Sequence, residues 1–406
     1  MKWIIAGLLT LIMLASLNIN ALAQEKVWEK KFGGSGFDTA RDIIETSDGG
    51  FIFVGTTKSY GNGGSDIYLV KTDSEGIQDW RKAYGGSADD AGYSIQPTKD
   101  NGFIVAGSTT SFGAGGLDAW ILKLDAAGTV QWDRPFGGTA DDEAFSVKQT
   151  KDGGYIIAGY TKSFGNGGKD LWVFKLNPEG DEKWFRYFGT TSDDEGKDAI
   201  ELRDNGYIVT GYTTRPGSGK DLWILELDNN GKKIGEKIVG SKDTKAGMPA
   251  QDIGYSIKDM LNGSYVVAGT TESSASKADF WLIKAQSGNI AWDKKFGGPE
   301  PDESYSVDLT PDDGFILAGR TKTHQSKTYD IWLVRTDSGG NELWNATFGG
   351  SDNESAFAVR TTSDSRYILA GQAGSNLGDD ALLVMVKDVI EPVLSLNNST
   401  GKPFFL

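Results

Sequence analysis

A long motif recurs along the chain, and this repetition limits the possible folds more than any other feature. The stretch YGGSADDAGYSIQPTKDNGFIVAGSTTS (84–111) returns as FGGTADDEAFSVKQTKDGGYIIAGYTKS (136–163), 52 residues further on. If the first residue of this FGG-type start marks each unit, seven units follow one another, at Phe32, Tyr84, Phe136, Phe188, Val239, Phe296 and Phe348. Seven copies at this period predict a propeller or another repeat array.

Three further landmarks keep the same register. A glycine ends an apolar run in every unit, at Gly55, Gly107, Gly159, Gly211, Gly269, Gly319 and Gly371. An aspartate precedes the next apolar run, at Asp66, Asp118, Asp170, Asp221, Asp279, Asp330 and Asp380. A tryptophan stands four residues before most unit starts, at Trp28, Trp80, Trp132, Trp184, Trp292 and Trp344. The remaining position is Gly235, which marks the degenerate copy.

Each unit contains four short segments with the pattern of β-strands. Turns rich in glycine and aspartate separate them, and in the third unit they are 143–150, 155–161, 170–176 and 182–188. The middle two segments are apolar at consecutive positions, so both of their faces must be buried. Blades packed radially between two neighbours bury both faces, whereas a two-sheet sandwich buries one. We expect neighbouring blades to press on the glycine that ends the second segment, Gly159 in this unit.

The two ends of the repeat complete one another. Val27–Phe32 has the pattern of a fourth strand and precedes any first strand, while the last unit ends near Lys387 without a fourth strand. We therefore predict an all-β fold, a seven-bladed β-propeller of four-stranded antiparallel blades. The N-terminal strand should complete the last blade by pairing with 380–387, which leaves no open edge.

The N-terminus indicates export. It has Lys2, then an apolar run, then Ala21 and Ala23 before the expected cleavage point. This predicts a signal peptide over 1–23, the propeller over 24–387, and a tail or linker over 388–406. We expect a monomer, secreted to the periplasm or the extracellular space, without a transmembrane segment.

Composition excludes several classes of site and partner. The chain has no cysteine, which rules out disulfides, thiolate metal sites and a lipid-modified N-terminal cysteine. Its formal net charge of −15 disfavours nucleic acid as a partner. With one histidine, His324, the sequence offers no Cys–His pair, no two-histidine metal site and no catalytic triad.

The unit, with its FGG start, its DGG turn, its AG pair and its closing tryptophan, resembles the repeat of secreted seven-bladed β-propellers of bacteria. The resemblance covers 27–387 and implies an extracellular or envelope protein, but little about activity. A weaker similarity to quinoprotein propellers and an outer-membrane assembly lipoprotein rests on 125–132 and 337–344. Those proteins have eight units and a threonine that is missing here, which argues against a bound quinone.

Two sets of acidic residues should share one face of the propeller, where the inter-blade loops meet the loops between second and third strands. Loop carboxylates are typical ligands of Ca²⁺, and the candidate ligands are Asp90, Asp118, Asp142 and Asp170. The alternative is that each carboxylate accepts hydrogen bonds from its own loop. Occurrence in every unit favours this alternative. We therefore predict no cofactor and leave Ca²⁺ open.

Departures from the repeat are the better guide to a ligand site, because binding loops vary on a fixed scaffold. The loop 240–256 is longer than its counterparts, and several later loops replace glycines by basic and polar residues. The candidate ligand-binding residues are Arg215, Lys242, Lys245, Met248, Lys277 and His324. Neutral drift of surface loops is the alternative interpretation.

These observations predict a non-enzymatic binding or scaffold propeller of the bacterial envelope or exterior, in contact with protein or polysaccharide. The alternative is a propeller enzyme, either a polysaccharide hydrolase or lyase or a quinone-dependent dehydrogenase. The lack of a recognisable catalytic cluster favours the first class. The mouth of the central channel should separate the two classes. A deep pocket with convergent polar groups outside the repeat would favour an enzyme, whereas a shallow mouth with only repeated residues would favour a scaffold.

Overall fold

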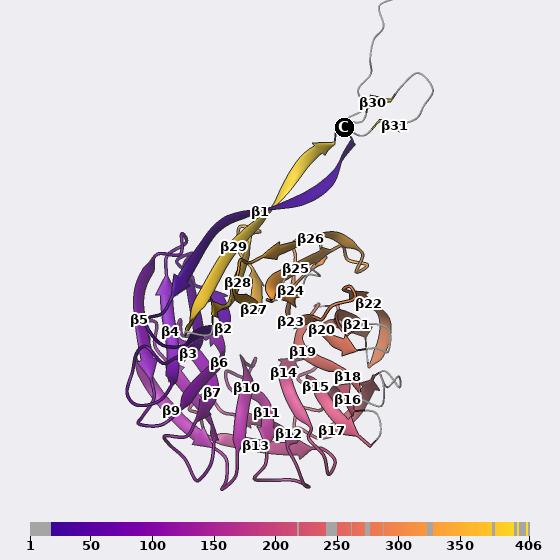
Figure 1. Cartoon of the computed structure of the whole chain (residues 1–406). Coiled ribbons are helices and arrows are strands. Elements are labelled where there is room, and N and C mark those ends of the chain that lie inside the picture. Colours follow the sequence, from indigo (N-terminus) through magenta and orange to yellow (C-terminus); the bar gives the residue numbers. More distant parts are fainter. Residues whose placement is uncertain are drawn as a thin grey trace, which may run out of the picture.

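The computed structural model describes residues 18–216, 219–240, 250–260, 262–272, 277–286, 288–322, 328–375 and 378–393, with the short pair 396–397 and 403–404. Seven four-stranded antiparallel sheets surround a central channel, so the predicted all-β seven-bladed propeller is confirmed (Figure 1). Within these ranges there is no helix, and hence none long and apolar enough to cross a membrane.

The blades follow one another in chain order. Blade 1 is formed by β2 (Asp38–Glu45), β3 (Phe51–Thr57), β4 (Asp66–Thr72) and β5 (Gln78–Tyr84). Blade 2 is formed by β6 (Asp90–Pro97), β7 (Phe103–Thr109), β8 (Asp118–Leu124) and β9 (Val130–Phe136). Blade 3 is formed by β10 (Asp142–Gln149), β11 (Tyr155–Thr161), β12 (Asp170–Leu176) and β13 (Glu182–Phe188). Blade 4 is formed by β14 (Glu195–Glu201), β15 (Tyr207–Arg215), β16 (Gly219–Leu227) and β17 (Lys233–Val239), with β18 (Ala250–Gln251) beside β16. Blade 5 is formed by β19 (Ile253–Asp259), β20 (Ser264–Glu272), β21 (Ala278–Gln286) and β22 (Asn289–Phe296). Blade 6 is formed by β23 (Asp302–Leu309), β24 (Phe315–Thr321), β25 (Asp330–Thr336) and β26 (Glu342–Phe348). Blade 7 is formed by β27 (Asn353–Thr361), β28 (Tyr367–Ser375), β29 (Gly378–Val393) and β1 (Asn18–Phe32), and β30 (Leu396–Asn397) pairs with β31 (Pro403–Phe404).

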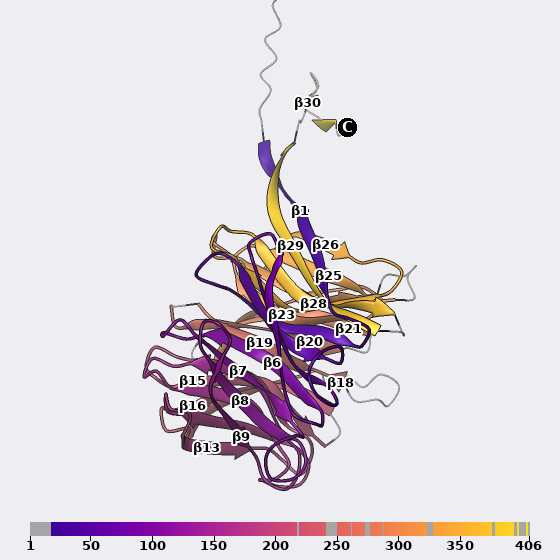
Figure 2. The ribbon, with the colours of Figure 1, turned by 90° about the vertical axis from the view of Figure 1, so that its left-hand side faces the viewer.

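Strand β1 closes the ring as predicted. It pairs antiparallel with β29, from Glu25 opposite Lys387 to Phe32 opposite Ala381. The pairing also continues outward, so that β1 and β29 leave the ring together as a two-stranded ribbon (Figures 1 and 2). Strand β1 thus begins within the expected signal peptide, and β29 extends six residues into the expected tail, to Val393.

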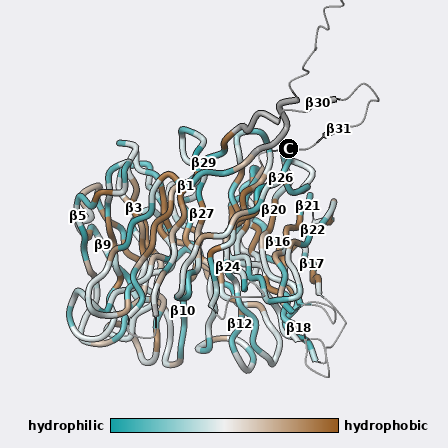
Figure 3. The backbone as a smooth tube through the Cα atoms, turned by 45° about the horizontal axis from the view of Figure 1, so that its top comes forward, coloured by the Kyte–Doolittle hydropathy of each residue, from teal (hydrophilic) through white to brown (hydrophobic). Residues whose placement is uncertain are grey.

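The core lies between blades rather than within one central layer. Both faces of β7 and β8 are buried along their whole length, and the hydrophobic side chains form a separate cluster at each blade interface. Apolar stretches accordingly follow the strands, and polar stretches follow the turns (Figure 3). The recurring tryptophans cover these interfaces from the outer strands. Trp132, for example, packs edge-on against Tyr155 of the next blade, with ring centroids 5.9 Å apart.

The glycine at the end of the second strand is tightly packed, but our expectation about its neighbour is wrong. A Cβ on Gly159 would overlap the carbonyl oxygen of Glu143 and lie 3.0 Å from the Cα of Ala144, both in β10 of the same blade. The cause is a β-bulge in β10, where the pairing skips one residue between Ala144 and Ser146. The bulge, and not an adjacent blade, leaves no room for a side chain.

Candidate functional site at the channel mouth

The same bulge occurs in the first strand of every blade and turns one side chain into the channel. In β10 the extra residue is Phe145, which has no direct partner in β11. The seven bulged residues form a ring, which we call the channel ring, composed of Arg41, Tyr93, Phe145, Lys197, Tyr255, Tyr305 and Phe357. They line a cavity of about 90 Å³. Five aromatic groups and two cations therefore meet where the repeat itself places no fixed residue type.

Neighbouring members of the channel ring contact one another. The Arg41 guanidinium lies 4.1 Å from the centre of the Phe357 ring, and the Lys197 ammonium lies 4.0 Å from that of Phe145. Tyr255 and Tyr305 pack edge to face with centroids 5.3 Å apart. Such cation–aromatic and aromatic contacts hold each side chain in place without using all of its polar groups.

Below the channel ring, toward the opposite face, salt bridges link neighbouring blades. Lys258 in blade 5 lies 3.0 Å from Asp308 in blade 6, and Lys148 in blade 3 lies 3.6 Å from Asp198 in blade 4. Arg360 in blade 7 pairs with Asp42 in blade 1. These charges compensate one another inside the channel, where Asp42, Lys148, Asp198 and Arg360 line the same cavity as the channel ring.

A cluster of charged residues stands above the channel ring on blades 3 and 4. The Glu195 carboxylate accepts hydrogen bonds from Lys169, at 2.6 Å, and from Lys197. Burial alone would raise the pKa of Glu195, but Lys197 and Lys169 outweigh that effect and hold it at about 2. Glu143 lies one blade earlier and is half-buried, and burial raises its pKa to about 7 against the opposing influence of Lys169 and Lys197. Two glutamates on neighbouring blades therefore differ strongly in side-chain pKa.

Aromatic residues and further cations extend this cluster around the mouth. Lys169 lies over the Tyr160 ring at 3.9 Å, and Lys220 over the Tyr212 ring at 4.2 Å. On the far side, Arg320 donates two hydrogen bonds to Glu303, at 2.8 and 2.9 Å. The mouth thus combines aromatic faces, ammonium and guanidinium groups, and one carboxylate that titrates near neutrality.

The four aspartates proposed as Ca²⁺ ligands bind their own loops. Asp142 accepts a hydrogen bond from the Gly138 amide at 2.8 Å and another from the Ser163 hydroxyl at 2.6 Å. The same amide bond to the loop occurs at 2.8–2.9 Å for Asp90, Asp118 and Asp170. Across the described part of the chain, no three histidine, cysteine or acidic residues are grouped to hold a metal ion. Ca²⁺ binding by these residues stays a prediction.

Of the six residues predicted from the sequence to bind a ligand, the structure describes two. Arg215 forms an ion pair with Asp221 at 2.8 Å, and Lys277 forms one with Glu300 at 2.7 Å. The structure brings neither of them to the channel ring. The other members, Lys242, Lys245, Met248 and His324, lie outside the described residues.

Sequence reasoning missed the channel ring, although a signal was present. One position in each unit varies between aromatic and cationic types, whereas its neighbours follow the repeat. It lies three residues after the acid that recurs near each unit start, which is Asp38, Asp90, Asp142, Asp194, Asp252, Asp302 or Glu354. A regular strand would alternate its side chains between two faces, so the pattern alone gave no reason to single this residue out. The bulge changes which side chain points inward.

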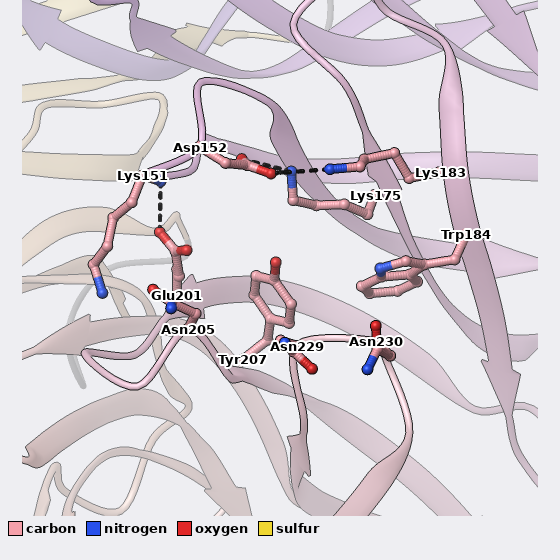
Figure 4. Close-up of a pocket in the computed structure, with 10 residues that line it drawn as sticks. All are labelled: Lys151, Asp152, Lys175, Lys183, Trp184, Glu201, Asn205, Tyr207, Asn229 and Asn230. Atoms are coloured by element: carbon pink, nitrogen blue, oxygen red, sulfur yellow. Dashed lines mark hydrogen bonds and ion pairs between the residues drawn. The ribbon is translucent and has the colours of Figure 1, made fainter.

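A second hollow, of about 500 Å³, lies on the opposite face between blades 3 and 4 (Figure 4). Trp184 and Tyr207 line it beside three asparagines, while Lys175 and Lys183 both reach Asp152, at 2.9 and 3.2 Å. Glu201 accepts a hydrogen bond from the Lys151 amide at 2.8 Å. Because these charges already have partners and their positions largely follow the repeat, the channel mouth is the stronger candidate site.

Comparisons with known proteins agree with the fold. No model of a known protein family matches the chain. The regulatory protein FlaEY of Caulobacter vibrioides is 26% identical over 201 residues, which are 46% of this chain and 19% of that protein. This chain therefore matches only a small part of that relative's length.

Solved structures superpose over most of the chain. The WD40 domain of Neurospora crassa Pan2 does so with a TM-score of 0.54 and 9% identity, over 91% of this chain and 97% of that one. A polysaccharide lyase, an ulvan lyase bound to -[GlcA(1-4)Rha3S]-, gives a TM-score of 0.55 and 9% identity, over 91% and 96%. At such identity the likeness concerns the fold alone, and it shows that this chain is a β-propeller.

Proposed function

We propose that this chain is a secreted binding propeller that holds an acidic polysaccharide across its channel mouth. The observation that carries the proposal is the channel ring, in which two cations stand among five aromatic side chains. Sugar rings present apolar faces that pack on aromatic side chains, and uronate carboxylates pair with ammonium and guanidinium groups. A cavity of about 90 Å³ is smaller than typical ligand pockets, so the polymer would lie across the mouth rather than enter it.

Cations at the mouth can pair with an anionic ligand although the chain as a whole is acidic. They are Arg41, Lys169, Lys197, Lys220 and Arg320, and the carboxylates near them include Glu143, Glu195, Glu303, Asp141 and Asp193. Burial keeps Glu143 partly protonated near neutral pH, which lowers the negative charge further. The ulvan lyase, which shares the fold, is bound to an acidic saccharide, and this is a precedent for such a ligand on a propeller.

Calorimetry with defined oligosaccharides tests the proposal. We expect an oligoglucuronate to bind and a neutral gluco-oligosaccharide of equal length to bind at least about tenfold more weakly. Lys197→Ala should weaken oligoglucuronate binding by about tenfold, because it removes a cation from the channel ring. Lys237→Ala, at an exposed position of the outer strand β17, should leave binding unchanged. Equal affinity for the two saccharides, or equal losses in the two variants, would overturn the proposal.

The separated acidities of Glu143 and Glu195 favour a second candidate, a lyase that cleaves the same polysaccharide. A group with a pKa of about 7 suits a general base at neutral pH. In this reaction Glu143 would take the proton from C5 of a uronate, a C4–C5 double bond would form, and the C4–O bond would break with protonation of the leaving oxygen. Ultraviolet absorbance of the unsaturated product is the readout. If the wild type turns over the polysaccharide and Glu143→Gln abolishes turnover but still binds, the protein is a lyase. Binding without turnover in the wild type would support the non-enzymatic binding propeller instead.

A further inference from the structure

Blade 4 lacks a pair of residues that the other six blades share. In each of those six blades, a lysine, arginine or methionine of the third strand lies opposite the recurring tryptophan of the fourth, as Lys175 lies opposite Trp184. In blade 4 the two positions are Glu226 and Gly235. The exception therefore loses the aromatic ring and reverses the charge at the same place.

The cavity between blades 4 and 5 has no tryptophan in its lining, unlike the equivalent hollow between blades 3 and 4, which Trp184 lines. Between blades 3 and 4 the indole of Trp184 packs on Tyr207, with centroids 5.8 Å apart, and lies against Gly231 in the next turn (Figure 4). Between blades 4 and 5 the equivalent region is a cavity of about 350 Å³, lined by Ile208, Glu226, Leu227, Ile234 and Tyr265. We call this cavity the blade 4–5 slot. Its volume falls within the range of small-molecule pockets.

The Glu226 side chain reaches the place that an indole occupies elsewhere. A Cβ on Gly288, the turn glycine of blade 5, would lie 2.9 Å from Oε1 of Glu226, whereas Gly231 and Gly340 face a tryptophan ring. Within the described residues the Glu226 carboxylate has no hydrogen-bond or ion-pair partner. Burial, followed by the nearby charge of Asp204, raises its pKa.

A second polar group in the slot lacks a partner. Tyr265 is 1% exposed, and its hydroxyl has no hydrogen-bond partner among the described residues. A buried hydroxyl without a partner is unfavourable, and most such groups in proteins are satisfied. At the equivalent position of blade 7, by contrast, the Tyr367 hydroxyl donates a hydrogen bond to Asp388 at 2.7 Å. The slot thus offers a carboxylate and a phenol oxygen within apolar walls.

We propose that the blade 4–5 slot binds an aromatic amine, a flat ring that carries a protonated amino group on a short chain. The ring packs on the apolar side chains of Ile208 and Leu227, beside the place that Glu226 fills instead of an indole. The ammonium group donates hydrogen bonds to Glu226 and to the Tyr265 hydroxyl oxygen. Asp204 and Asp259 at the rim add negative charge, and Arg203 is the cation among the lining residues. This site is independent of the channel mouth.

Tryptamine is a suitable probe, and indole and indole-3-acetate isolate its parts. By calorimetry we expect tryptamine to bind, indole to bind at least about tenfold more weakly, and indole-3-acetate not to bind. Glu226→Gln should weaken tryptamine binding by about tenfold and leave indole binding unchanged. Glu179→Gln, an exposed acid in a turn of blade 3, is the matched control and should change neither.

Gly235→Trp tests the location by restoring the residue found in the other blades. The backbone there tolerates a side chain, because the nearest atom to an added Cβ is Oε2 of the flexible Glu226, at 2.9 Å. The variant should lose tryptamine binding while its melting temperature stays the same or rises, which shows that it folds. Absence of tryptamine binding to the wild-type protein, or unchanged binding in Gly235→Trp, would overturn the proposal.

Discussion

The titration of Glu143 should be visible in the stability of the protein. Burial raises its pKa from the ordinary 4.5 to about 7, so the folded state binds this proton more tightly than the unfolded chain does. The resulting stabilisation is full below about pH 4 and is lost as the pH rises to about 7. Glu143→Gln removes the cost of burying the charge. We expect the variant to exceed the wild type by about 1–3 kcal/mol at pH 8 and to match it near pH 4. Urea melts at several pH values measure this difference.

Glu195→Gln is the matched control for that experiment. Its pKa of about 2 reflects the pairing with Lys197 and Lys169, so its charged form stabilises the fold at neutral pH. The variant should be less stable than the wild type at pH 7, with a loss that shrinks as the pH falls below about 4. Differences that stay constant with pH for both variants would contradict the assigned acidities.

Gly159 should tolerate no side chain. A Cβ there would overlap the Glu143 carbonyl, a backbone atom held by the bulge of β10, so the strand itself would have to move. We expect Gly159→Ala to cost about 3 kcal/mol, at the upper end of overpacking effects. Gly298→Ala is the control, because no atom lies within 4 Å of its added Cβ, and its cost should stay below about 0.5 kcal/mol. Denaturant melts of both variants would contradict this account if the two costs were equal.

At single positions, the sequence predicts what the repeat determines and misses what the backbone geometry determines. The loop aspartates, such as Asp142, could be interpreted correctly as hydrogen-bond acceptors because the residue recurs in the same short loop. The inward direction of Phe145 could not, since one inserted residue in a strand reverses which face a side chain occupies. The lost indole at Gly235 is plain in the sequence, but the cavity beside it, with Glu226 and Tyr265 in its lining, is visible only once blade 5 is in place.

Among the strands, β1 should carry much of the stability, because it closes blade 7. Its inner part pairs with β29 from Glu25 to Phe32, and its removal would expose the hydrogen-bonding edge of β29. Deletion of 27–34 should therefore lower the melting temperature markedly and promote aggregation, both measurable by thermal melts and size-exclusion chromatography.

A chain that begins at Gln24 is the control for this deletion. It loses the outer part of the ribbon but keeps every pair from Gln24 opposite Asp388 to Phe32 opposite Ala381. Its melting temperature should stay close to that of the longer chain. An unchanged melting temperature after deletion of 27–34 would contradict closure by β1.

The order of the strands was predictable, whereas their exact extent was not. The ends of the repeat show which strand each terminus contributes, and antiparallel blades follow from the short turns. The continuation of β29 to Val393 depends on a partner from the other end of the chain, which local pattern does not reveal. The parallel pairing of β18 with β16 likewise depends on where an irregular loop returns.

Across the propeller, regular and irregular features have different consequences. Repeated residues build blades and tie loops, so they carry the fold. Both proposed binding sites lie where the copies differ, at the channel ring, which varies from blade to blade, and at the exceptional pair Glu226 and Gly235 of blade 4. A scaffold with seven equivalent interfaces can change one of them at little cost to the remaining six, because each interface has its own hydrophobic cluster.

The propeller is closed a second time on its channel side, by Arg360. This arginine of blade 7 pairs with Asp42 of blade 1 and donates a hydrogen bond to Ser306 of blade 6 at 3.3 Å. Asp42 in turn accepts a hydrogen bond from the Ile95 amide of blade 2 at 3.1 Å. One buried ion pair thus connects four successive blades across the junction of the first and last repeats.

Removal of Arg360 should therefore weaken closure more than its single salt bridge suggests. Arg360→Met keeps the apolar stem but leaves Asp42 buried without its cation, and breaking a buried pair in this way typically costs about 3–5 kcal/mol. The double variant Arg360→Met with Asp42→Asn should recover part of that loss, because the uncompensated charge is gone. Urea melts give both free energies. Limited proteolysis should cut the Arg360→Met variant first near the 7–1 junction. A cost below about 1 kcal/mol for the single variant would show that β1 alone closes the propeller.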